Sequence, residues 1–184
     1  MEKLQSGKYY HIYNRGNNKQ NIYFEDDNYQ YFKQLLKKHL LPILKIYAYC
    51  LLPNHFHLVL RINDDIQKPY QALSNLMNAY TKAINKRFNR SGSLFQKPFK
   101  RIEIENENYF KNLILYVHHN PEKHNVIDDY RNYEHSSYKS LIISKKDITD
   151  LNYVDKYFDS TENFIFVHNS KKIQFDIESL ILED

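Results

Sequence analysis

The strongest constraint on the fold is the order in which short strand-like and longer helix-like segments alternate along the first two thirds of the chain. The strand-like segments are rich in aromatic and β-branched residues, whereas the helix-like segments repeat apolar residues every three to four positions. This order, β-α-β-β-α-β, predicts an α+β fold of the ferredoxin-like (RRM-like) kind, an antiparallel sheet with helices packed on one face, followed by one more helix. The expected strands are 8–13, 43–51, 55–62 and 99–104, and the expected helices are 27–41, 69–89 and 107–119.

Composition excludes several classes of protein. The chain has 184 residues, of which 42% are hydrophobic and 26% charged, so it is long enough for one folded domain with an appendage. Its single cysteine, Cys50, excludes an internal disulfide. The N-terminus lacks the apolar core of a signal peptide, and no apolar run is long enough to cross a bilayer. We therefore expect a soluble, cytoplasmic protein.

The charge is unevenly distributed. Net charge is +4, yet residues 147–184 contain nine acids and only three lysines. Residues 81–101 contain no acid and seven cations, a pattern that attracts polyanions but also fits a solvated helix face. The seven are Lys82, Lys86, Arg87, Arg90, Lys97, Lys100 and Arg101. The acidic residues predict either a solubilising end or a cover for the basic surface.

Two histidines open the third expected strand. Side chains alternate between the two faces of a strand, so His55 and His57 should point the same way and Phe56 the opposite way. Two imidazoles on one face can share a metal ion, although such pairs are more often ordinary polar residues. Imidazole ligands suit zinc as well as manganese.

The helix expected at 107–119 contributes a second group. Its core stripe is flanked by Tyr109, Tyr116 and Asn120, and the last two lie one turn apart. A phenol is a poor nucleophile at neutral pH, but a nearby cation can make it a useful one. The alternative is that Tyr116 is an amphipathic residue at the edge of the core. Because a residue before proline avoids the helical region, the helix is predicted to end at Asn120-Pro121.

Several motifs together resemble a known family. The chain is similar to the single-tyrosine HUH transposases, the IS200-like insertion-sequence transposases, and most of all to the REP-associated tyrosine transposases. The resemblance spans about residues 8–142, and the segment after Asn120-Pro121 departs from it by lacking a frequent glycine. The motifs that carry it are YHIYNRGNNKQNIYF (10–24), LLPNHFHLVL (51–60), GSLFQKPFKRIEI (92–104), YVHHNPEKHNV (116–126) and HSSYKSL (135–141).

The resemblance implies a chemistry and a set of roles. It implies that His55, His57 and Asn120 hold Mg²⁺ or Mn²⁺, and that Tyr116 attacks a DNA phosphodiester to form a 5′-phosphotyrosine link. The substrate would be single-stranded or hairpin DNA in a bacterial cell, no nucleotide cofactor would be needed, and a homodimer is possible. Contacts to the DNA backbone are expected from Arg15, Lys97, Lys100, Arg101, Lys82 and Arg87.

Three functional hypotheses follow. The first is a metal-dependent transposase that nicks and rejoins DNA through Tyr116, with residues 1–142 as its domain and 143–184 as an acidic extension. The second is a domesticated single-stranded DNA-binding protein without strand-transfer activity. The third is a metal-dependent nuclease that uses water, in which Tyr116 is structural. If Tyr116 is not the nucleophile, Tyr109 is the nearest alternative.

Overall fold

The computed structural model describes residues 3–144 and 147–170, and the last acidic residues of the chain, within 171–184, lie outside this part. All four expected strands and all three expected helices are present. The elements are β1 (Tyr9–Arg15), the 3-10 turn η1 (Asn17–Lys19), α1 (Asp26–His39), β2 (Leu44–Leu52), β3 (His55–Ile62), α2 (Pro69–Arg87), β4 (Lys100–Glu103), α3 (Glu107–Lys123), the 3-10 turn η2 (Tyr130–Asn132), α4 (Tyr138–Ile142), α5 (Tyr153–Phe158) and α6 (Thr161–Asn169).

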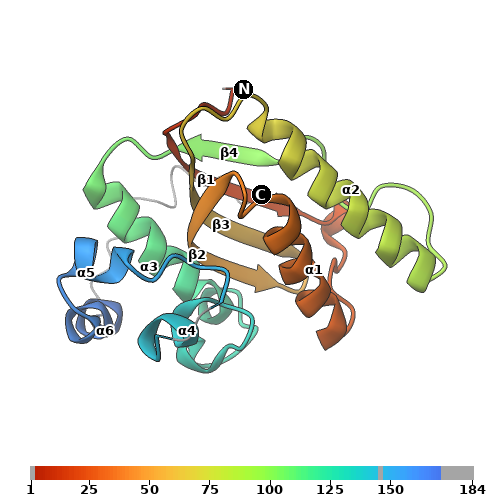
Figure 1. The fold of residues 1–184 in the computed structure, drawn as a ribbon. Helices are drawn as coiled ribbons and strands as arrows, with labels where there is room; N and C mark the ends of the chain where they lie inside the picture. Colours follow the sequence, from red (N-terminus) through yellow and green to blue (C-terminus); the bar gives the residue numbers. More distant parts are fainter. Residues whose placement is uncertain (1–2, 145–146, 171–184) are drawn as a thin grey trace.

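The four strands form one antiparallel sheet in the order β2-β3-β1-β4. This arrangement confirms the predicted ferredoxin-like α+β fold, because β1 lies between β3 and β4, with β2 at the edge next to β3. The register places Tyr13 of β1 opposite His57 of β3 on one side and opposite Lys100 of β4 on the other. Figure 1 shows α1 and α2 on one side of the sheet and α3 on the other.

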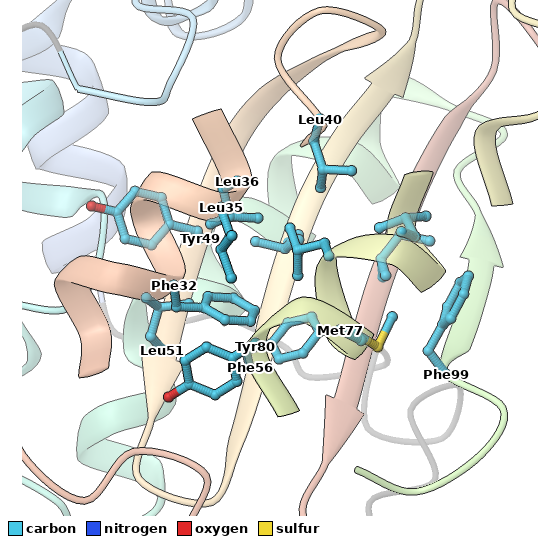
Figure 2. Close-up of a cluster of buried hydrophobic side chains, with 14 of the residues drawn as sticks. Phe32, Leu35, Leu36, Leu40, Tyr49, Leu51, Phe56, Met77, Tyr80 and Phe99 are labelled. Carbon is cyan, nitrogen blue, oxygen red and sulfur yellow. The ribbon is translucent and has the colours of Figure 1, made fainter. Parts of the chain in front are cut away.

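The first core lies between the sheet and the pair α1 and α2. Phe32 of α1 packs against Phe56 of β3 with the ring centres 5.2 Å apart, and against Tyr80 of α2 at 5.0 Å. Figure 2 shows these rings together with Leu36 and Met77, which belong to the same buried cluster between the helices and the sheet. Burial of this apolar stripe is the main force that holds both helices on the sheet.

The second core lies on the opposite face, under α3. The sheet contributes Tyr47, Cys50 and Val59 to this core, and α3 contributes Phe110 and Val117. The same core continues into α5 and α6, so residues of the acidic C-terminal segment pack against the sheet domain. Asp147 and Asp150 of that segment form ion pairs with lysines of α1 and β2.

A buried hydrogen-bonded chain, which we call the relay, joins α6 to α3 and β2. It consists of His168, His118 and Ser137, each of which is almost completely shielded from solvent. Nδ1 of His168 is 2.7 Å from the carbonyl oxygen of Phe164, Nδ1 of His118 is 2.9 Å from Nε2 of His168, and Nε2 of His118 is 2.7 Å from Oγ of Ser137. The amide of Tyr49 donates to the same Oγ at 3.0 Å.

The relay fixes the position of every proton in it. A carbonyl only accepts, so Nδ1 of His168 must donate and its Nε2 must accept. Nδ1 of His118 is therefore the next donor, and the hydroxyl of Ser137 donates to Nε2 of His118. Both imidazoles are neutral in this arrangement. Burial lowers the pKa of His118 well below its usual value and lowers the pKa of His168 to about 3.

Candidate active site

Strand β3 presents its two histidines to the face that α3 covers. His55 and His57 are buried with their ring centres 5.1 Å apart, whereas Phe56 points into the first core. The alternation expected from a strand is therefore observed. Because the strand lies in the middle of the sheet between β2 and β1, both imidazoles are held by backbone ladders on each side.

Helix α3 brings the tyrosine to these histidines. The helix begins at Asn106, whose side chain accepts from the amide of Tyr109, and its apolar stripe faces the sheet. Tyr116 is 1% exposed, and its ring centre lies 5.8 Å from His57 and 6.5 Å from His11, both edge to face. The Nζ of Lys123 lies over the Tyr116 ring, 4.9 Å from its centre.

The predicted end of this helix at Asn120-Pro121 is wrong. Helix α3 continues through Pro121 to Lys123, and the amide of His124 still donates to the carbonyl of Asn120. Proline removes one backbone donor and disfavours the helix, but one further turn can form where packing holds it. Pro121 is buried, and this added turn carries Lys123 to the tyrosine.

Asn120 faces the histidine pair. Tyr116, Asn120 and His124 follow one another at intervals of four residues and so lie along one side of α3. The first contacts His57, and the last contacts His55 at a ring distance of 4.7 Å, which places Asn120 between the two contacts. Asn120 is 0% exposed, and its Nδ2 donates to the carbonyl of Tyr116 at 3.0 Å. Its Oδ1 has no hydrogen-bond partner among the described residues.

These residues fit a divalent metal ion. Nδ1 of His55 donates to Oδ1 of Asn54 at 2.6 Å, and Nδ1 of His57 is 2.9 Å from Nε2 of His11. A metal would therefore be bound through the Nε2 atoms, as is usual when the other ring nitrogen is hydrogen-bonded. The buried Oδ1 of Asn120 supplies an oxygen donor. Within residues 3–144 and 147–170, no group of three or more His, Cys, Asp or Glu side chains is arranged to hold a metal, so the set depends on this asparagine.

Three residues beside the candidate site stand inside the family motifs but had no predicted role. They are His11, which contacts His57, His124, which contacts His55, and Lys123, which lies over Tyr116. His11 could have been found from the predicted topology, because in this fold β1 pairs with β3. Lys123 and His124 could not, because the helix was expected to end before them.

The predicted basic residues are divided between the two faces of the sheet. In the register of the sheet, Arg15 lies opposite His55 and Lys100 lies opposite Tyr13. Both cations therefore belong to the face of the candidate site. Arg101 points to the other face, where its guanidinium lies over the rings of Tyr70 and Phe99, 5.5 and 5.6 Å from their centres.

The other three predicted cations lie on α2 or beside it. Lys82 of α2 and Lys97 line a hollow of about 680 Å³ between that helix and residues 92–99. Arg87 forms an ion pair with Glu25 at 2.5 Å. The predicted DNA-contacting residues therefore form two groups, one on each face, and not one continuous strip.

Comparisons with known proteins agree with this fold. The family model "Transposase IS200 like" matches residues 5–120. The chain belongs to this family, and as a transposase it is a DNA-processing enzyme.

A solved structure shows the same fold. It is described as "Structure of the REP associates tyrosine transposase bound to a REP hairpin", and it superposes with a TM-score of 0.66 at 16% sequence identity. The match covers 82% of this chain and 94% of that one. No curated protein matches the sequence. No helix in the described part of the chain is long and apolar enough to span a membrane.

Proposed function

We propose that this transposase cleaves and rejoins single-stranded or hairpin DNA through a covalent bond to Tyr116, with Mg²⁺ or Mn²⁺ held by His55, His57 and Asn120. The observation that carries the proposal is the buried Oδ1 of Asn120, which lies on the same side of α3 as Tyr116. A nucleophile and an oxygen donor one helical turn apart, facing two imidazoles, match the needs of phosphoryl transfer.

The reaction is a transesterification. The phenolic oxygen of Tyr116 attacks a phosphorus atom, the P–O3′ bond breaks, and the DNA keeps its 5′-phosphate on the tyrosine while a 3′-hydroxyl leaves. The phenol loses its proton, and the leaving 3′-oxygen gains one from solvent. The number of phosphoester bonds is unchanged, so no nucleotide cofactor is needed. Attack by a 3′-hydroxyl on the phosphotyrosine reverses the step and rejoins strands.

Each group of the site has a defined part in this reaction. A divalent metal, when bound, would offset negative charge that builds up on the non-bridging phosphate oxygens. Lys123 places a second positive charge beside the phenol. Because Tyr116 is almost completely shielded, the DNA strand must displace the side chains that cover it, and Lys123, which lies over the ring, is one of them.

Tyr116 is a better candidate for the nucleophile than Tyr109. Tyr109 lies about three turns away from Asn120 along α3, whereas Tyr116 lies about one turn away. Tyr109 therefore serves as the matched control.

The DNA is expected to contact both faces of the domain. Arg15 and Lys100 flank the candidate site, while Lys82 and Lys97 line the hollow at α2. The structural neighbour was solved with a REP hairpin, which supports a hairpin as substrate. A DNA stem on one face and an unpaired strand at the other would use both groups of cations. We expect this activity in the bacterial cytoplasm.

The test is formation of a covalent adduct. Wild type, Tyr116→Phe and Tyr109→Phe are each incubated with Mn²⁺ and single-stranded oligonucleotides from the hairpins that flank the gene. We expect an adduct on a denaturing gel for wild type and Tyr109→Phe, and none for Tyr116→Phe, which still binds DNA. An adduct that persists in Tyr116→Phe refutes the assignment. DNA binding by wild type without any metal-stimulated cleavage supports the alternative of a binding protein.

A further inference from the structure

His11 is a buried histidine that the reaction proposed above does not use. It lies on β1, is 0% exposed, and stacks on His57 with ring centres 5.1 Å apart and planes at 15°. Tyr13 also stacks on His11, with the ring centres 4.8 Å apart. The Nε2 of His11 lies 2.9 Å from Nδ1 of His57, a hydrogen bond between neighbouring strands.

We propose that His11 is a positioning residue that orients the imidazole of His57 for metal binding. This inference rests on the proposed function, in which His57 is a ligand. A neutral imidazole has one N–H, and the nitrogen that binds a metal must carry a lone pair. If His57 binds through Nε2, its proton is on Nδ1 and needs an acceptor. The Nε2 of His11 is that acceptor, which places the proton of His11 on its own Nδ1.

The other histidine of the pair is held in the same way. Nδ1 of His55 donates to Oδ1 of Asn54 at 2.6 Å. Each imidazole thus has an acceptor at Nδ1, from the preceding residue for His55 and from the adjacent strand for His57. Two different side chains produce one outcome, in which both rings present Nε2. Packing alone does not require this, because an apolar ring at position 11 would stack on Tyr13 and His57 equally well.

Outer partners of this kind fix the tautomer and the direction of a ligand, and their loss usually weakens metal binding about 10- to 100-fold. Replacing His11 with phenylalanine keeps an aromatic ring between Tyr13 and His57 but removes the acceptor. Replacing it with glutamine restores an acceptor through Oε1. The pair of variants therefore separates the hydrogen bond from the stacking.

The experiment measures Mn²⁺ affinity of the full chain without DNA, by calorimetry and by electron paramagnetic resonance. We expect His11→Phe to bind Mn²⁺ at least about tenfold more weakly than wild type, and His11→Gln to recover most of the loss. His39→Phe, a histidine replacement at the end of α1, is the control and should leave the affinity unchanged. Wild-type affinity in folded His11→Phe overturns the proposal.

A second measurement needs no variant. The ¹⁵N shifts of the His57 imidazole in wild type should show a protonated Nδ1 and an Nε2 that responds to Mn²⁺. A protonated Nε2 contradicts the inference. If wild type binds no Mn²⁺, or if His57→Ala binds it as well as wild type does, the assignment of His57 as a ligand fails first, and the failure lies in the proposed function.

Discussion

Helix α3 lies between two buried groups of histidines with different surroundings. On one side is the relay of His118, His168 and Ser137, in which all four ring nitrogens have protein partners and the chain ends in backbone groups. On the other side is the pair His55 and His57, whose Nδ1 atoms are held and beside which Asn120 keeps an oxygen without a partner. Buried polar groups are normally satisfied, so the complete relay indicates a structural role, whereas the unpartnered Oδ1 of Asn120 is consistent with a place for a ligand.

Tyr116 and His118 show that a residue of the proposed active site and a structural residue of the relay can lie close together on one helix. Two residues apart on a helix, they point to nearly opposite sides. The relay holds one side of α3 through α6, and the other side carries the phenol to His57. The difference predicts that changes in the relay alter stability, whereas changes at the pair alter metal binding.

The largest expected effect is on stability, in His168→Ala. The change opens a cavity under α6 and leaves the Nδ1–H of His118 without its acceptor, so the free energy of unfolding should fall by about 4 kcal/mol. Denaturant unfolding measures it. Asn169→Ala, on the exposed surface of the same helix, should stay within about 0.5 kcal/mol of wild type. If the free energy of unfolding of His168→Ala fell by less than about 1 kcal/mol, the relay would not be a stabilising interaction.

The next effect is acid destabilisation through the same histidine. The pKa of His168 is lowered to about 3 by burial, whereas an unfolded histidine titrates near 6.5. Below pH 6.5 the unfolded chain binds a proton that the folded chain does not, so stability falls as pH falls. The loss should reach about 3 kcal/mol between pH 6.5 and pH 4 from this group alone. Unfolding curves across this range should be less pH-dependent in His168→Ala, and equal slopes would contradict the prediction.

A smaller effect is expected at the pair, and on another quantity. His55→Gln removes a proposed ligand, and Mn²⁺ affinity should fall at least about 100-fold, because losing a ligand costs no less than losing its outer partner. Folded His168→Ala should keep wild-type Mn²⁺ affinity. Calorimetric titration of both variants tests the separation of roles. Equal losses in the two variants would mean that the two sides of α3 are not independent.

The smallest effect is expected for Asn120→Ala. An amide oxygen is a neutral ligand, and we expect its loss to weaken Mn²⁺ binding about tenfold, as much as the smallest loss expected for an outer partner of a ligand. The variant also loses the hydrogen bond to the carbonyl of Tyr116. Asn163→Ala on α6, which removes a side-chain hydrogen bond far from the pair, serves as the control. Unchanged affinity in Asn120→Ala would exclude it as a ligand.

The sequence predicted the common face of His55 and His57 but not the relay. Strand periodicity is short and local, so the common face of His55 and His57 follows from the chain alone. The contact of His118 with His168 joins residues fifty positions apart, and α6 carries no motif that marks it. The last turn of α3 was also missed, because packing of Pro121 outweighs its local preference.

Ser137, the second serine of the HSSYKSL motif, shows what sequence reasoning could not assign. Ser137 accepts from the amide of Tyr49 and donates to His118, so it joins β2 to α3 across the edge of the second core. A motif that resembles part of an enzyme family thus has a supporting role here, and its hydroxyl is shielded from solvent. Only the fold distinguishes such a residue from a reactive one.

The hydrogen bond from Asn120 to the carbonyl of Tyr116 also decides which parts of the enzyme move together. The proposed nucleophile and the proposed oxygen ligand belong to one rigid turn, while the two imidazoles belong to the sheet. Any shift of α3 as a whole away from β3 would move both groups away from the imidazoles together. Docking of one helix would then act as a single on-off step for cleavage, and the chain would avoid breaking DNA while half assembled.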